Sequence, residues 1–458
     1  MPAVRRNTDG MRWIFFLYLG LIVWAPLPLG SNRPWSWAVL ALWVFALALG
    51  WLAGRIRGRY PYPAIFRDAR PVLWCAALWL IYVWLQLLPL PIGLLELVSP
   101  EAARWHLAAA APQSLAAAPL TLDRYATLEA ACKSTAYIAF FALSLALLCE
   151  RARIRQAAYA LIASGVLQAL YGALYRFQNL EHVAAGTFAN RDHYATYLVM
   201  CLSVGIGVLI ATLSGARYRS WVLFFRDAIQ WMITPKMALR LGLVVMVIAL
   251  VLSRSRMGNI SFFASLMGAG AIGLLLAKRA TRSMVILLAS LVAVDVFLVG
   301  TYFGTQRVIE RIAQTDMQTE DRGEVAVWTL NMWKDYPVFG SGLGSFPVVY
   351  PRYAGQKAYW TYTHAHNDYL EFGAETGAVG LALLASIVLL SLAAALRAQY
   401  LRRDPLMRGL SFAAIMGIGS LLVHSFVDFS LQIPANALTF MLLLAFAWIS
   451  LRYTDAES

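Results

Sequence analysis

The sequence predicts an all-α protein, a polytopic bundle of about twelve transmembrane helices. Hydrophobic residues make up 60% of its 458 residues and charged residues only 14%, and the mean hydropathy is +0.62. These values lie far from those of soluble globular domains. Apolar runs also recur at close to the roughly 20 residues that a helix needs to cross a bilayer, whereas a membrane β-barrel shows short alternating segments. The chain is therefore expected to be a helical membrane protein.

The predicted spans follow one another along most of the chain. The first follows three arginines and lacks a small-residue cleavage site, which predicts a retained helix and not a signal peptide. The twelve spans are expected at about 12–30, 35–53, 72–90, 132–149, 157–177, 193–214, 237–253, 258–277, 283–303, 377–396, 409–426 and 434–451.

The net charge of +14 suggests a nucleic-acid partner, but its distribution argues against one. With the N-terminus in the cytoplasm and the sides alternating, most of the 38 lysines and arginines fall in the cytoplasmic connections. This is the positive-inside bias of membrane proteins. The basic residues mainly orient the chain among membrane lipids, and no nucleic-acid partner is expected.

Three parts are predicted: nine helices with short loops over residues 1–303, a large external loop with short helices over 304–366, and three helices over 367–458. In the loop, Asp321–Glu324 resembles a capping box that opens a helix, and Lys334 followed by Pro337 closes it. Three glycines at 340, 342 and 344 predict a flexible turn. An earlier external segment, 91–131, is expected to hold a surface helix after Ser99.

The most polar stretch near a predicted span is THAHNDYLEFGAETGAVG, residues 363–380. Asn367 is a predicted N-cap, which places His366 at a helix start, facing outward. The helix dipole there disfavours the imidazolium, so His366 is expected to be neutral and able to accept a proton. Two other interpretations remain open: interfacial histidines without a chemical role, and a metal site of His364, His366 and Asp368 that lacks an evident fourth ligand.

Arginines also stand at external helix ends, where they are not needed for orientation. Arg191 follows Asn190 before the sixth span, and Arg254 and Arg256 lie in the tight turn between the seventh and eighth. Arg191 could equally be a snorkelling anchor. Charges at this depth are costly unless paired, and the two spans beside that turn contain no acidic residue. Their partner is therefore distant in sequence or is a ligand.

These residues together resemble a known family. His366-Asn367, nine further residues and then Gly377–Gly380 are similar to the signature of the bacterial O-antigen ligase superfamily, which includes O-antigen polymerases and protein O-oligosaccharyltransferases. The family's other blocks have counterparts, in order, at Gly186–His193, Ser253–Gly258 and Arg322–Phe346. The resemblance covers about residues 90 to 430.

The resemblance implies a GT-C-like glycosyltransferase in the bacterial inner membrane, with its active site facing the periplasm, acting in lipopolysaccharide or surface polysaccharide biosynthesis. Such an enzyme transfers a glycan from undecaprenyl diphosphate to an acceptor hydroxyl, without metal, cofactor or nucleotide sugar. The acceptor would be lipid A-core in a ligase, a growing glycan in a polymerase, or a protein.

By position, the resemblance also implies roles for individual residues. His366 would be the base, and Arg191 and Arg322 would act with it in catalysis by holding the diphosphate. The surrounding substrate-binding residues would be Asn190, Arg254, Arg256, His364, Asn367 and Asp368.

The chemistry agrees with these assignments. The planar fork of arginine matches phosphate oxygens, and fixed positive charge stabilises a departing diphosphate. Neutral histidine suits removal of the acceptor proton near pH 7. Attack opposite the diphosphate would invert the anomeric carbon.

Two other function classes stand beside this one. A transporter for a lipid-linked or anionic glycan would also have about twelve spans, but internal repeats and midplane sites are typical of transporters, and neither is evident here. A non-catalytic glycan-binding or assembly protein is the third class, and loss of transfer on changing His366 would argue against it.

Overall fold

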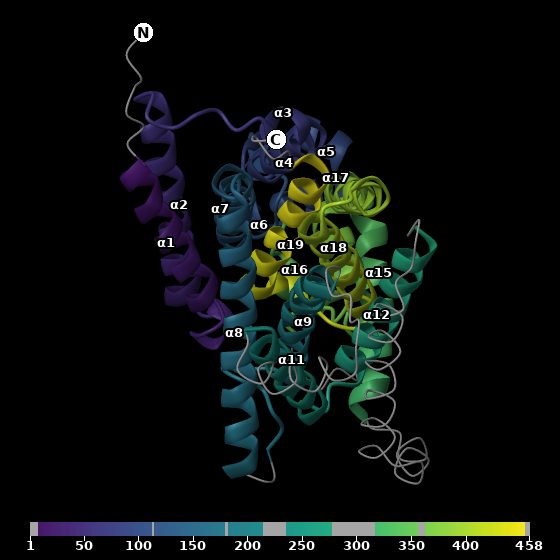
Figure 1. The fold of residues 1–458 in the computed structure, drawn as a ribbon. Helices are drawn as coiled ribbons and strands as arrows, with labels where there is room; N and C mark the ends of the chain where they lie inside the picture. The colour runs from purple at the N-terminus through teal and green to yellow at the C-terminus, as the bar shows by residue number, and fades with distance from the viewer. Residues whose placement is uncertain are drawn as a thin grey trace, which may run out of the picture.

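The computed structural model describes residues 8–111, 114–178, 182–213, 235–276, 317–355 and 362–453, which fold mainly as helices (Figure 1). Eight helices are long and apolar enough to cross a membrane: α2 Pro34–Ile56, α7 Arg124–Leu147, α8 Arg151–Gln178, α9 Arg191–Leu213, α12 Arg256–Leu275, α17 Asp368–Leu401, α18 Pro405–His424 and α19 Pro434–Arg452. Three apolar helices are shorter: α1 Thr8–Trp24, α4 Arg70–Leu85 and α11 Pro235–Leu252. The chain is a multi-pass membrane protein.

The predicted helical membrane class is confirmed. A helix lies at each predicted span except 283–303, which falls outside the described residues. Three of these helices are shorter, so the described residues contain eight clear spans, and the count of about twelve stays a prediction.

Three helices form the centre of the bundle. In the most apolar stretches of α9, α18 and α19, respectively 83%, 78% and 94% of the residues are buried, as expected for helices that are hydrophobic on all sides. Helices α9 and α18 meet at Gly207 and Gly409, where a Cβ on either residue would lie 2.2 Å from the carbonyl oxygen of the other. Only glycine permits this approach, and small residues at crossings are the usual basis of packing between membrane helices.

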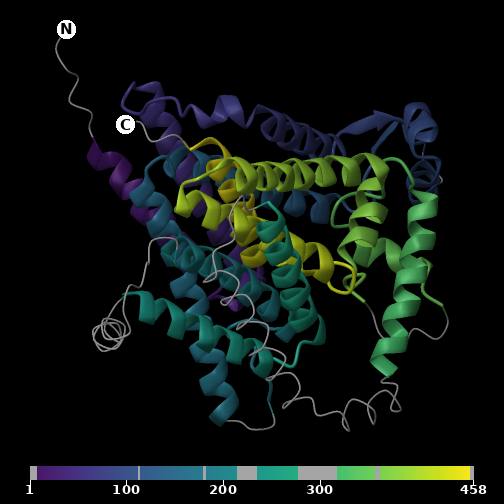
Figure 2. The same cartoon turned by 45° about the vertical axis from the view of Figure 1, so that its right-hand side comes forward.

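The outer helices present apolar side chains to the surroundings. Only 28% of the apolar stretch is buried in α2 and in α17, and Trp13 and Trp74 are 71% and 68% exposed. In Figures 1 and 2, α1 and α2 lie along one flank of the bundle, beside α7 and α8. These faces fit contact with lipid.

A second, smaller core lies outside the membrane helices. It joins a two-stranded antiparallel ribbon to short helices and α15, with buried side chains such as Leu95, Met332 and Phe346. Its elements are β1 Pro89–Pro91, α5 Ile92–Val98, α6 Pro100–Ala110, β2 Ala117–Pro119, α15 Met317–Asp335, α16 Phe346–Val349 and η2 Tyr350–Arg352. We call this the external unit. The two segments expected to be separate loops therefore share one core, and the ribbon departs slightly from the all-α prediction.

The external unit corrects two predictions. Helix α15 begins at Met317, so the expected capping box at 321–324 lies inside the helix. The glycines of the 340–344 turn all have positive φ, but the turn is held firmly: the Gly342 amide donates to the Glu375 carbonyl at 2.9 Å, and the Phe346 amide donates to Glu375 Oε1, also at 2.9 Å. The predicted helix after Ser99 and the helix end before Pro337 are confirmed, but the Ser99 side chain makes no capping hydrogen bond.

Helix α17 is kinked where it meets this turn. Gly377 has φ 62° and ψ −171°, and a Cβ there would lie 2.2 Å from the Val338 carbonyl. The chain after Pro337 fills the kink, because the Ala378 amide donates to the Pro337 carbonyl at 2.8 Å. The predicted span beginning at 377 thus starts at the kink, and the turns before it pack against the external unit. The remaining short elements are η1 Leu29–Ser31, α3 Ile65–Asp68 and η3 Ser430–Gln432.

Candidate functional site

Several helix ends converge between the membrane helices and the external unit. The Asp368 amide at the start of α17 donates to the Ser425 carbonyl after α18, at 3.0 Å. The starts of α9 and α12 touch, since a Cβ on Gly258 would lie 2.5 Å from that of Ala195. Residues far apart in sequence therefore meet where α9, α12 and α17 begin and α18 ends.

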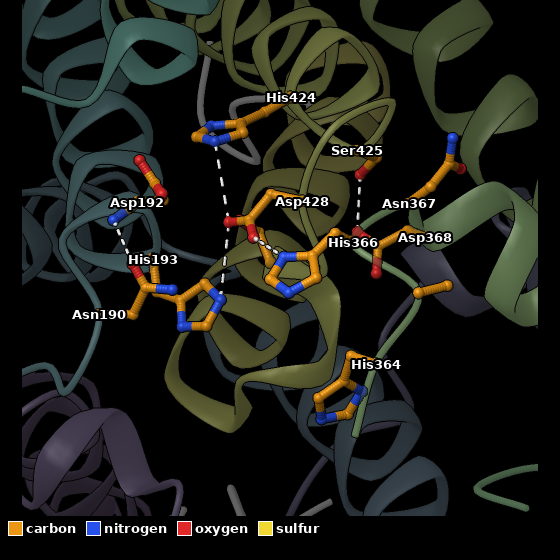
Figure 3. Close-up of polar contacts among 12 residues, drawn as sticks. Asn190, Asp192, His193, His364, His366, Asn367, Asp368, His424, Ser425 and Asp428 are labelled. Atoms are coloured by element: carbon orange, nitrogen blue, oxygen red, sulfur yellow. Dashed lines mark hydrogen bonds and ion pairs between the residues drawn. The ribbon is translucent and has the colours of Figure 1, made fainter. Parts of the chain in front are cut away.

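One carboxylate stands at the centre of this junction. Asp428 is 1% exposed and lies between three imidazoles from different elements (Figure 3). Its Oδ2 is 3.5 Å from His193 Nε2 and 3.8 Å from His424 Nε2, and its Oδ1 is 3.8 Å from His366 Nδ1. We call these four residues the histidine cluster.

The charge of Asp428 depends on its imidazole neighbours. Burial by itself raises the pKa of its carboxyl, but the hydrogen-bonding groups and charges of His193, His366 and His424 outweigh burial and hold the pKa well below its ordinary value. Asp428 is therefore an anion near neutral pH, placed to stabilise an imidazolium.

His366 does not face outward as expected. Its φ of 51° lies in the left-handed region, which turns the ring inward, so that Nδ1 faces Asp428 and its side chain is 20% exposed. Asn367 is the predicted N-cap, with its Oδ1 accepting from the Leu370 amide at 3.0 Å. The other ring nitrogen of His366, Nε2, points away from Asp428 (Figure 3).

Phe429 holds three of the histidine rings. It stacks on His364 with ring centroids 4.2 Å apart and an interplanar angle of 17°. The rings of His193 and His366 meet it edge to face at 4.6 and 4.9 Å. His364 Nδ1 is also 2.7 Å from Oε1 of the buried Glu371. His364 is thus held apart from Asp428, beside the histidine cluster.

The other polar candidates have structural partners. Asn190 Oδ1 accepts from the Asp192 amide at 2.8 Å and so caps the start of α9. Asp368 Oδ2 accepts from the Ser425 hydroxyl at 2.8 Å, while its Oδ1 is buried without a hydrogen-bond partner. These residues shape the junction.

The arginines begin two of the converging helices. Arg191 is the first residue of α9 and is exposed, as is Arg256 at the start of α12. Arg254 is half-buried with φ 54°. The side chain of Arg322 lies outside the described residues. Four non-glycine residues in the described part of the chain have positive φ, and two of them are Arg254 and His366. Such backbone strain concentrates at functional sites.

The prediction from sequence does not include three members of the histidine cluster, His193, His424 and Asp428. It does not include Phe429 either, which contacts the rings of His193, His364 and His366. One signal was present: His424 and Asp428 are four residues apart at the end of a membrane span, where ionisable residues usually have a function.

A cavity of about 430 Å³ adjoins the junction. It lies between α7, α17, α18 and α19 and is lined mostly by apolar side chains, with Asp368, Ser425 and Gln432 among its few polar neighbours. In the described residues no three histidine, cysteine or carboxylate side chains are placed to hold a metal ion together.

Comparison with known proteins adds one finding. A model of the O-antigen ligase family matches residues 241–385, a segment that includes Arg254, Arg256, His364 and His366. Helix α9 and Asp428 lie outside the matched segment. A search of curated proteins found no match.

Proposed function

The chain belongs to the O-antigen ligase superfamily, and from this premise we propose that it transfers a glycan from undecaprenyl diphosphate to an acceptor hydroxyl at the periplasmic face of the inner membrane. The observation that carries the proposal is the pair of His366 and Asp428, a histidine backed by a buried carboxylate, at the junction where arginine-bearing helices begin. A base and a site for a polyanion are the two requirements of this reaction.

His366 acts as the base. Nε2 takes the proton of the acceptor hydroxyl, and Nδ1 faces the anionic Asp428, which stabilises the imidazolium that forms. The acceptor oxygen attacks the anomeric carbon, the bond to the diphosphate breaks, and its electron pair departs with undecaprenyl diphosphate. Attack from the opposite side inverts that carbon. The step needs no metal or cofactor.

The diphosphate is assigned to the arginines. Arg191 and Arg256 lie in the first turns of α9 and α12, where the partial positive charge of the helix dipole adds to that of the guanidinium. Arg254 lies in the turn before α12, and Arg322 completes the set by its position in sequence. These charges stabilise the negative charge that grows on the leaving group.

A lipid-linked donor fits the surroundings. The junction lies at the ends of membrane helices, and the apolar cavity beside Asp368 is suited to hydrocarbon. The anionic Asp428 places negative charge on the His366 side, which favours a neutral hydroxyl there and leaves the diphosphate to the arginine side.

The test uses the full chain in vesicles with a glycan linked to undecaprenyl diphosphate. Release of undecaprenyl diphosphate is measured with lipid A-core, a growing glycan or protein as acceptor, and the product assigns the acceptor among the three. His366→Ala should lose about 10²–10⁴-fold in rate while still binding the donor. His364→Ala should be milder, and the exposed His182→Ala serves as the control.

Robust transfer by the His366→Ala protein would refute the base assignment. Activity that disappears on chelation and returns with added zinc would instead point to a metal enzyme.

A further inference from the structure

The two oxygens of Asp428 have different surroundings. Oδ2 accepts from the Ser430 hydroxyl at 3.1 Å and faces His193 and His424. Oδ1 faces His366 Nδ1 at 3.8 Å, and both of these buried atoms lack a hydrogen-bond partner. His193 Nε2, 3.5 Å from Oδ2, also lacks one, so both of these histidine contacts of the carboxylate are still unmade hydrogen bonds. Catalytic hydrogen bonds are often long before substrate binds and shorten in the complex.

His193 is held in place independently of Asp428. It is 4% exposed, its carbonyl accepts from the Asn436 side chain at 3.1 Å, and its ring meets Phe429 edge to face. It lies two residues after Arg191 at the start of α9. Of the three imidazoles around Asp428, His193 is the one whose helix also carries an arginine assigned to the donor.

We propose that His193 is a positioning residue for the transfer: facing Oδ2 of Asp428 at 3.5 Å, it closes on that oxygen when substrate binds, which leaves Oδ1 for His366 and couples the donor end of α9 to the base. This inference rests on the proposed function. His193 contacts neither donor nor acceptor and acts through the carboxylate alone.

The charged and titratable groups around His366 and Asp428 determine how the pH dependence of the transfer rate should change when His193 is replaced. His193 and Asp192 approach from α9, His424 from α18, and His364, Asp368 and Glu371 from the start of α17 and the chain before it. Without His193, the negative charge of Asp428 is shared by two imidazoles in place of three. The protonated form of His366 then gains stability, so the acid limb of the rate profile should move to higher pH.

Two substitutions separate this role from packing. His193→Gln keeps an amide donor that can reach Oδ2, whereas His193→Phe keeps the ring contact with Phe429 and loses the donor. We expect His193→Gln to retain most of kcat. His193→Phe should lose about 10–100-fold in kcat, because misplacing a catalytic group by about 1 Å can cost on the order of 10²-fold. The KM for the donor should change little, and His182→Gln is the matched control.

A second readout does not depend on transfer. NMR titration of the labelled histidines, with the His366 signal identified by its loss in His366→Gln, should show His366 titrating at higher pH in His193→Phe than in the wild type. Wild-type kcat and an unchanged His366 titration in His193→Phe would overturn the inference.

Two further outcomes are also decisive. If His193→Phe does not fold, His193→Asn, whose amide is too short to reach Oδ2, takes its place with the same expectations. If the wild type transfers no glycan from the lipid diphosphate, the proposed function fails, and the titration still decides whether His193 controls the base.

Discussion

Asp428→Asn should lower the transfer rate by about 10²–10³-fold. The substitution preserves shape and removes the charge that faces His366. At the observed Nδ1–Oδ1 separation of 3.8 Å, an imidazolium and a carboxylate attract each other by about 4 kcal/mol at an effective dielectric constant of about 20. Since about 1.4 kcal/mol corresponds to a tenfold change in rate, losing this attraction in full would lower the transfer rate by about 10³-fold. Polar contacts kept by the asparagine reduce the loss.

The assay is the vesicle transfer reaction over a range of pH, with Asp335→Asn as the control because Asp335 is exposed at the end of α15 and distant in role from the histidine cluster. Losing the carboxylate makes His366 harder to protonate, so the acid limb should move to lower pH, opposite to the shift expected for His193→Phe. Transfer within about threefold of the wild type, with an unmoved acid limb, would refute the electrostatic reasoning.

Three other outcomes follow from the structure. Arg191→Lys should lose most of the transfer activity although the charge is kept, because lysine lacks the bidentate fork of arginine. Near-normal transfer with unchanged donor affinity would show that Arg191 only anchors the helix end at the membrane surface. Gly409→Val should destabilise the chain by about 1–3 kcal/mol through overpacking against Gly207, seen as a lower thermal midpoint in detergent, and an unchanged midpoint would contradict the tight crossing. The pKa of Asp428 is depressed in the fold, so its stabilising contribution is complete above about pH 4 and is lost as the pH falls through the folded value. The gap in thermal midpoint between wild type and Asp428→Asn should therefore shrink on acidification, and a gap that widens would contradict the ionised assignment.

The helices were predictable because a membrane helix is encoded locally, in the length and hydropathy of one run of residues. Local signals also predicted the Asn367 cap and the helix end before Pro337. The start of α15 was wrong because a cap-like sequence also occurs inside helices, where tertiary packing decides the boundary.

The candidate site was only partly predictable. The arginines and His366 stood out by their type and position, but the partners of Asp428 come from α9, α18 and the chain before α17, and no local pattern specifies that meeting. The inward turn of His366 could not be predicted either, since its left-handed backbone is uncommon for residues other than glycine and depends on the surrounding structure.

The kink at Gly377 divides α17 into two bodies with different attachments. The first turns, which follow His366, are tied to the 340–346 turn, and the rest runs on among the membrane helices. A transmembrane helix adjusts to bilayer thickness by tilting. Here the amides of Ala378 and Val379, just after the kink, donate to the carbonyls of Pro337 and Val338 at 2.8 and 3.1 Å, so the membrane part of α17 is fastened to the external unit. We therefore expect a change in the tilt of α17 to be transmitted to the external unit through these two bonds.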